Sequence, residues 1–231
     1  MVAPIDGSQV LWPLSESHAL SVYPLINGTA GDFGPHDDSR EGVLGLIATL
    51  HLVEPIEAAQ RTGLEIPGRA NLLTAIDGPW AGGPYAANAQ ALLAAHDRQI
   101  RSRLDDHERM AAELRATTAD WVITHGEPHP GNVLHTVAGL LLIDWDTVRI
   151  APPERDLWLR TRDPFTPAAS DLARYQEATG RAPSQAGLDF YRLSWILADI
   201  AAYTDGLRRP HGEGGDAEDA LAYLEANLRM P

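Results

Sequence analysis

One stretch of the chain brings together the side chains that could do chemistry. It opens with the loop His125–Asn132, which reads H-G-E-P-H-P-G-N and contains an acid, Glu127, and an amide, Asn132. An apolar segment follows, and it ends at Asp144, with Trp145 and Asp146 directly after it. Carboxylate and amide oxygens are ligands that Mg²⁺ prefers, so this stretch is where we expect the functional site.

The loop is expected to be rigid rather than helical. Pro128 and Pro130 fix φ and block a helix, and Gly126 and Gly131 allow backbone conformations that other residues avoid. The metalloprotease motif H-E-x-x-H needs two histidines one helical turn apart, which the prolines prevent for His125 and His129. A zinc site is therefore not expected here.

The spacing that fits a known mechanism is His-x-acid-x-x-x-x-Asn, followed by a strand that ends in Asp. In kinase chemistry the acid orients the substrate hydroxyl or accepts its proton, and the later Asn and Asp hold Mg²⁺ against the nucleotide phosphates. Read without its neighbours, Asn132 could equally cap a turn. Asp146 could be a third carboxylate near the metal or a structural hydrogen-bond acceptor.

Periodicity predicts a mostly helical α+β protein with two small hairpins. One hairpin joins Val10–Leu14 to Ala19–Leu25, and the other turns at Val137–Gly139. The glycine-rich segment 27–35 matches no phosphate-binding pattern and is interpreted as a linker. The predicted helices are Asp38–Val53, Arg69–Ile76, Tyr85–Thr117, Arg155–Arg160, Pro167–Thr179, Leu188–Leu207 and Ala217–Leu228.

The amino-acid composition restricts the kinds of molecule that this protein is expected to bind. Lys plus Arg number 18 and Asp plus Glu 32, a formal charge of −14, which disfavours nucleic acid and anionic membranes and suits a cationic ligand. There is no cysteine, so disulfides, thiolate nucleophiles and cysteine-bound zinc are excluded. No signal peptide or membrane-spanning stretch is recognised, and a cytoplasmic protein is expected.

The motif resembles that of a known family. H-G-E-P-H-P-G-N-V-L, together with L-L-I-D-W-D-T and P-P-E-R-D-L, is similar to the aminoglycoside phosphotransferase family, small-molecule kinases with a protein-kinase-like fold. Tyr23–Gly28 resembles the family's interlobe hinge, and the helix ending at Ala48–His51 resembles the helix that follows it. The resemblance covers most of the chain.

The resemblance implies a role for each residue of the motif. Glu127 stands at the family's catalytic acid, Asn132 and Asp144 would bind Mg²⁺, and His125 would support the loop from beneath. Asp156 would act as a brace at the start of a helix rather than in chemistry. ATP would be the phosphoryl donor.

Main-chain groups of the hinge would meet the adenine of ATP, and Tyr23, Leu25 and Ile26 are the residues implied. The acceptor would be a hydroxyl of a small cationic molecule such as an aminoglycoside, which suggests an antibiotic-resistance enzyme. Candidate contacts for its positive charge are Asp199, Asp205 and the segment 213–219.

The sequence departs from the family pattern in two ways, and they leave two hypotheses open. The acid is Glu127 where the family usually has Asp, and no lysine is present anywhere in the sequence. Residues 1–27 are interpreted as a remnant of the N-terminal lobe and hinge, and residues 28–231 as the C-terminal lobe. The chain is then either an active kinase or a catalytically impaired homologue that binds small molecules.

Overall fold

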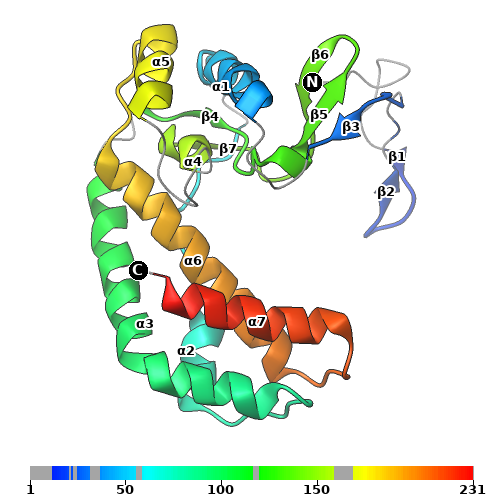
Figure 1. Ribbon diagram of the computed structural model, residues 1–231, viewed down its shortest axis with the longest axis vertical. Coiled ribbons are helices and arrows are strands. Elements are labelled where there is room, and N and C mark those ends of the chain that lie inside the picture. Colours follow the sequence, from blue (N-terminus) through cyan, green and yellow to red (C-terminus); the bar gives the residue numbers. More distant parts are fainter. Residues whose placement is uncertain are drawn as a thin grey trace.

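The described part of the chain is mostly helical and contains three small antiparallel sheets. The computed structural model describes residues 12–20, 22, 25–31, 37–55, 59–116, 120–158 and 169–230. In Figure 1 the sheets lie with α1, α4 and α5 in the upper half, and α2, α3, α6 and α7 form the lower half. The mostly helical α+β class expected from the sequence is confirmed.

The helices agree with the predicted ones to within a few residues. The most apolar helix begins at Gln185, earlier than the predicted start at Leu188. The reason is an N-cap at Ser184, whose Oγ accepts the Gly187 N–H at 3.0 Å. The helix predicted from Arg155 is one turn long, and residues 159–168 lie outside the described part. The observed helices are α1 (Asp37–His51), α2 (Arg69–Asp77), α3 (Ala86–Arg115), α4 (Glu154–Leu157), α5 (Ala169–Thr179), α6 (Gln185–Arg208) and α7 (Gly215–Arg229).

The N-terminal hairpin is present but shorter than predicted. Strand β1 (Trp12–Pro13) pairs antiparallel with β2 (Ala19–Leu20). Val22 and Leu25 are not in strands, so the predicted strand to Leu25 was wrong in its length. The reason is that few side chains here have anything to pack against, since Leu20 is 47% exposed and Leu25 92% exposed.

The central hairpin is confirmed, but it carries a third strand that the sequence did not predict. Strands β5 (Val133–Thr136) and β6 (Gly139–Leu142) pair with each other, and β3 (Thr29–Ala30) pairs with β5. The linker interpretation of 27–35 was therefore wrong at these two residues. Glycine is needed beside this strand because a Cβ at Gly28 would lie 2.7 Å from the His135 carbonyl oxygen.

A second strand pair frames the stretch that contains the loop and Asp144, and the prediction of only two hairpins missed it. Strand β4 (Val122–Thr124) comes directly before the loop, and β7 (Arg149–Ala151) follows shortly after Asp146. The two pair antiparallel, with Thr124 opposite Arg149. Because β4 and β7 pair, the chain enters the loop and leaves the Asp144 segment side by side.

Two apolar clusters hold the halves together. The first packs α1, α4 and α5 around Ile47, Leu157 and Tyr175, and the second packs α2, α3, α6 and α7 around Leu93 and Ile200. Helices α3 and α6 contribute to both clusters. The half of the fold that contains the strands and residues 125–146 therefore packs against the helical half.

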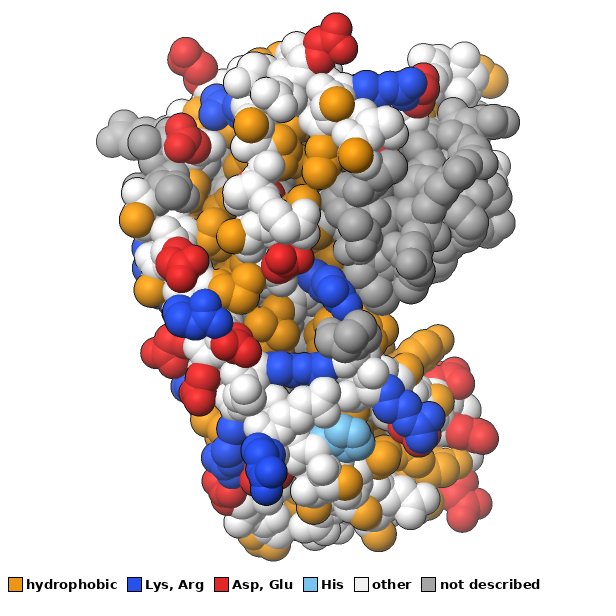
Figure 2. Space-filling model, turned by 60° about the vertical axis from the view of Figure 1, so that its left-hand side comes forward, with side chains coloured by type: hydrophobic (Ala, Val, Ile, Leu, Met, Phe, Trp, Pro, Cys, Tyr) orange, Lys and Arg blue, Asp and Glu red, His pale blue; other side chains and the backbone are white. Residues whose placement is uncertain are grey.

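The charged half of α3 is a solvated face, as predicted. Arg101 lies 2.6 Å from Asp97, one turn away, and Arg109 lies 2.6 Å from Asp106. Figure 2 shows acidic and arginine side chains interleaved over one face of the molecule. Within the described residues, no helix is both long and apolar enough to cross a membrane.

Candidate active site

The loop that follows β4 is held in a tight turn. Residues Pro130–Asn132 form a single 3-10 turn, in which the Asn132 N–H donates to the His129 carbonyl at 2.9 Å. The Asn132 side-chain nitrogen donates to the Glu127 carbonyl at 3.0 Å. This bond engages the amide nitrogen, so the amide oxygen is the atom of Asn132 available to a cation.

Two hydrogen bonds connect this loop to the segment that ends in Asp144. The Ile143 N–H donates to the Asn132 carbonyl at 3.0 Å, and His125 Nε2 donates to the Ile143 carbonyl at 2.8 Å. His125 is fully buried and its ring packs edge-on against Trp145. Asn132 and Asp144 are therefore brought to the same end of the β5–β6 hairpin.

Asp144 has an unusual backbone. Its φ is 64°, in the left-handed region that residues other than glycine rarely adopt. Conformations of this kind cost about 1–3 kcal/mol and persist where the surroundings enforce them, often at functional sites. Its side chain and that of Glu127 are both exposed, so each carboxylate can reach a ligand.

Asp156 braces the loop through its carboxylate. It is completely buried, and its oxygens accept the N–H groups of His125 at 2.7 Å and Gly126 at 2.6 Å. His51 Nε2 lies 3.1 Å from the same carboxylate. Burial alone would raise the pKa of Asp156, but the hydrogen bonds from His51 and from the N–H groups of Gly126 and His125 outweigh it and hold that pKa below its usual value.

His51 and Tyr175 complete this buried network. The Tyr175 hydroxyl lies 2.8 Å from His51 Nδ1, and both side chains are buried. A neutral His51 with its proton on Nε2 satisfies both contacts, donating to Asp156 and accepting from Tyr175. The network joins α1, α4 and α5 to the loop 125–132. A polar His51 on the apolar stripe of its helix was the sequence signal for it.

Removing the Tyr175 hydroxyl tests the outer end of this network. We expect Tyr175→Phe to lower the free energy of unfolding by about 1–3 kcal/mol, because a buried acceptor on His51 loses its donor. Urea unfolding measures this change. Tyr223→Phe, at a position that is 56% exposed, should leave stability unchanged. Equal stability of the Tyr175 variant and the parent would show that this hydrogen bond contributes nothing.

Arg155 packs against the loop from the other side. Its guanidinium donates to Thr124 Oγ1 and to the Thr147 carbonyl, both at 2.8 Å. Gly126, with φ 102°, lies so close that a Cβ there would sit 2.4 Å from Arg155 Nη2. Burial lowers the pKa of Arg155, although Asp156 opposes that shift. Arg155 was not predicted from the sequence as a site residue.

The residues implied for adenine contact are only partly described. Tyr23 lies outside the described residues, while Leu25 is 92% exposed and Ile26 is half-buried. The same segment reaches the catalytic loop further on, where the Gly31 N–H donates to the Pro130 carbonyl at 3.1 Å and the Val133 carbonyl at 3.2 Å. Residues 25–31 therefore lie along the edge of the candidate site.

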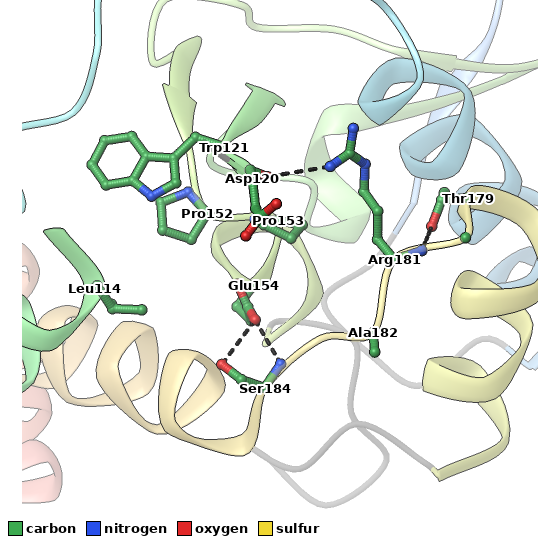
Figure 3. A pocket seen from close by; sticks show the side chains of 11 residues that line it. Leu114, Asp120, Trp121, Pro152, Pro153, Glu154, Thr179, Arg181, Ala182 and Ser184 are labelled. Atoms are coloured by element: carbon green, nitrogen blue, oxygen red, sulfur yellow. Dashed lines mark hydrogen bonds between the residues drawn. The ribbon is translucent and has the colours of Figure 1, made fainter. Parts of the chain in front are cut away.

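A sizeable cavity lies elsewhere, and Glu154 at the start of α4 is among the residues that line it (Figure 3). Its volume is about 580 Å³, and it is lined by residues from the ends of α3 and α5 and the start of α6. None of Glu127, Asn132 and Asp144 lines it. One of its two acidic residues, Glu154, already accepts the N–H and hydroxyl of Ser184 at 2.6 and 3.0 Å. We therefore place the chemistry at the loop and the segment that ends in Asp144, where Glu127 and Asp144 are exposed, and not in this cavity.

The loop residues fit a magnesium ion that is shared with phosphates. Asp144 offers an exposed carboxylate and Asn132 an amide oxygen, both hard ligands. No group of three or more His, Asp or Glu suited to a metal exists among the residues that the structure describes. Mg²⁺ commonly takes one or two protein oxygens and completes its shell with phosphates and water, so a two-residue site suits it.

Comparison with models of protein families finds a match over most of the chain. A family model described as "Phosphotransferase enzyme family" matches residues 40–194, which include the loop, the hairpin and Asp156. The chain belongs to this phosphotransferase family. The family resemblance inferred from the motif is thereby confirmed.

Individual relatives show how far the similarity extends. The chain is 37% identical over 166 residues to Protein StrN of Streptomyces griseus, across 65% of this chain and 43% of that protein. It thus spans less than half the length of this relative.

Solved structures share the fold. A spectinomycin phosphotransferase in complex with ADP and spectinomycin has a TM-score of 0.74 at 18% identity, covering 100% of this chain and 74% of that one. The choline kinase LicA from Streptococcus pneumoniae has a TM-score of 0.57 at 14% identity, covering 94% of this chain and 73% of that one. These likenesses establish the protein-kinase-like fold of the small-molecule kinases.

Proposed function

We propose that this family member is an ATP-dependent phosphotransferase that moves the γ-phosphoryl group of ATP to a hydroxyl of a small molecule. Glu127 orients the acceptor hydroxyl or takes its proton. Asn132 and Asp144 hold Mg²⁺, which neutralises charge on the phosphates. His125, Asp156 and Arg155 position the loop and do not touch the reacting atoms.

One observation supports this proposal more than any other. The hydrogen bonds from Asn132 to the Glu127 carbonyl and from Ile143 to the Asn132 carbonyl tie the acid, the amide and the Asp144 segment into one unit. Phosphoryl transfer asks a protein mainly for positioning and charge neutralisation. A loop with this many internal hydrogen bonds suits that demand.

The acceptor is proposed to be cationic, an aminoglycoside-like molecule. The formal charge of −14 would attract such a molecule and raise its local concentration. The nucleotide is proposed to lie along residues 23–26, with residues 1–27 acting as the hinge side and 28–231 as the lobe that binds magnesium and the acceptor. In this proposal the reaction modifies an antibiotic by phosphorylating it.

The direct test is phosphoryl transfer itself. The chain is incubated with Mg²⁺ and γ-labelled ATP, together with spectinomycin, an aminoglycoside or choline, and labelled product is separated chromatographically. We expect label to appear on at least one acceptor in excess of a sample without acceptor. The matched control is Asn132→Ala, which should give no product because a metal ligand is lost.

A second candidate function, a binding module without catalysis, has its own support. Glu127 is longer than the family's usual Asp, and a displacement of about 1 Å can cost on the order of 100-fold in rate. The sequence also contains no lysine to meet the phosphates. This candidate is favoured over the first if Mg²⁺ and ATP bind but no acceptor is labelled.

A further inference from the structure

The cavity beside Glu154 is not used by the proposed function. Its volume is about 580 Å³, and two of its walls flank the candidate active site in the sequence. Asp120 and Trp121 come directly before β4, and residues 152–154 come directly after β7. The turn between α5 and α6 forms another wall (Figure 3). A molecule in this cavity would therefore contact both ends of the β4–β7 strand pair.

Glu154 lines the cavity and has one carboxylate oxygen without a partner. The residue is 5% exposed, and its Oε1 accepts both the N–H and the hydroxyl of Ser184, at 2.6 and 3.0 Å. Its Oε2 accepts no hydrogen bond from any residue that the structure describes. A buried carboxylate oxygen is costly to leave unpaired, so this side of the cavity lacks a hydrogen-bond donor.

Arg181 and Trp121 show the opposite deficit. Arg181 Nη1 donates to the Asp120 carbonyl over a long 3.4 Å, and Arg181 Nε is buried and has no partner in the described part of the chain. The indole N–H of Trp121, a residue that is 7% exposed, also has none there. Both side chains can only donate hydrogen bonds, so this part of the cavity lacks an acceptor.

Rings form much of the remaining wall. Trp121, Pro152 and Pro153 contribute apolar ring surfaces. Figure 3 shows Glu154 and Arg181 on different sides of the same space. Small-molecule sites in proteins commonly measure about 300–1,000 Å³ and combine apolar walls with a few polar groups. The cavity has this composition, and it suits a planar ring with polar substituents.

We infer that this cavity binds a neutral aromatic amide. The amide N–H donates to Glu154 Oε2, and acceptor atoms of the same molecule face Arg181. The aromatic ring packs against Trp121 and the two prolines. None of the proposed kinase residues lines the cavity, so the inference does not depend on the proposed kinase activity.

Charged ligands match the cavity less well. An anion would meet the carboxylates of Glu154 and Asp120, and a cation would meet the guanidinium of Arg181. A metal ion is not favoured, because the described residues contain no cluster of three or more His, Asp or Glu that could hold one. Water alone could pair with the polar groups but would leave the apolar rings without a partner. A cavity that holds only water would bind none of the probes below.

The test uses nicotinamide as the probe, with methyl nicotinate and nicotinate as matched compounds. Methyl nicotinate keeps the ring and the carbonyl but has no N–H donor, and nicotinate has a carboxylate in place of the amide. Binding is followed by two-dimensional ¹H–¹⁵N NMR on the full chain, through the indole N–H signal of Trp121. The absence of that signal in Trp121→Phe assigns it.

We expect saturable shifts of the Trp121 signal with nicotinamide. Each matched compound should bind roughly tenfold more weakly or worse, because a hydrogen bond to a charged group is lost. No saturable shift, or equal binding of nicotinamide and methyl nicotinate, would overturn the inference.

Variants assign the binding to the cavity. Glu154→Gln keeps an acceptor for Ser184 but replaces the free oxygen with an NH₂ group, and it should weaken nicotinamide binding roughly tenfold. Arg181→Met removes the donors on the other side and should weaken binding by a similar factor. The control is Glu177→Gln, an exposed position on α5 that does not line the cavity, and it should bind like the parent.

The same NMR spectra report whether each variant is folded, so a failed fold is not mistaken for lost binding. If Glu154→Gln and Arg181→Met are folded and both bind nicotinamide like Glu177→Gln, the inference is wrong. Addition of Mg²⁺ and ADP should not displace nicotinamide, because the proposed nucleotide site lies at the loop. Displacement by ADP would place the probe in the nucleotide site and would likewise overturn the inference.

Discussion

Replacing Asp156 with alanine is expected to destabilise the protein by about 3–5 kcal/mol, the cost typical of breaking a buried charged contact. The substitution would leave the N–H groups of His125 and Gly126 and the Nε2–H of His51 without their acceptor. Asp156, His125 and His51 are all buried. Urea unfolding followed by far-ultraviolet circular dichroism measures the change.

The pH dependence of stability gives a second readout for Asp156. Because the folded-state pKa lies below the unfolded value of about 3.9, its contribution is present above that value. It is lost as the pH falls from there through the lower folded pKa. The parent should therefore lose stability below about pH 4 more steeply than Asp156→Asn does.

The control for this prediction is an exposed carboxylate. Asp106→Ala removes a solvent-exposed partner of Arg109 and should change stability by no more than about 0.5 kcal/mol. A loss for Asp156→Ala as small as that of the control would contradict the role of Asp156 as the brace of the loop.

Glu127→Gln is expected to lower kcat by about 100- to 10,000-fold, the range that general-base catalysis commonly supplies. The substitution keeps the side-chain length and removes the carboxylate. It leaves the loop intact, because Asn132 binds the main-chain carbonyl of Glu127 and not its side chain. The measurement is steady-state phosphoryl transfer to whichever acceptor the parent uses.

Two comparisons make the Glu127 prediction specific. Affinity for Mg²⁺·ADP should stay within about twofold of the parent, since the metal ligands are elsewhere. Glu127→Asp restores the acid at the family's usual length and should keep far more activity than Glu127→Gln. If Glu127→Gln retains the parent's kcat, another group acts on the hydroxyl and the assignment fails.

Much of this architecture could be predicted from the sequence because its signals are local. Helical periodicity and caps predicted every described helix longer than one turn, and the turn at Val137–Gly139 predicted the β5–β6 hairpin. Pro128 and Pro130 exclude an α-helix, and they therefore predicted that this segment forms a loop. The kinase-like spacing of Glu127, Asn132 and Asp144 is likewise a local signal, and it pointed to these three residues as the site.

The parts that were missed depend on contacts between distant segments. Strand β3 has two residues in a glycine-rich stretch, and only its pairing with β5 makes it a strand. Similarly, β4 and β7 are three residues each and stabilise one another across the catalytic stretch. No local period reveals such short strands.

The supporting network was missed for a related reason. Residue His51 is separated from Asp156 and Tyr175 by more than a hundred positions, and the three meet only in the folded core. Asp156 was expected to brace its own helix, yet its carboxylate accepts the loop N–H groups instead. Likewise, the sequence offered Asp199 and Asp205 as equivalent cation contacts, and only the structure separates the paired Asp205 from Asp199.

The central claim, that Asp144 belongs to a magnesium-dependent nucleotide site, is tested most directly by calorimetric titration of ADP with and without Mg²⁺. We predict that Mg²⁺ strengthens ADP binding to the parent at least tenfold, and that Asp144→Asn abolishes this gain. Asp189→Asn, a carboxylate on α6 bonded to Gln185, should respond like the parent. An ADP affinity that is independent of Mg²⁺ in the parent, or a full Mg²⁺ effect in Asp144→Asn, would contradict the account.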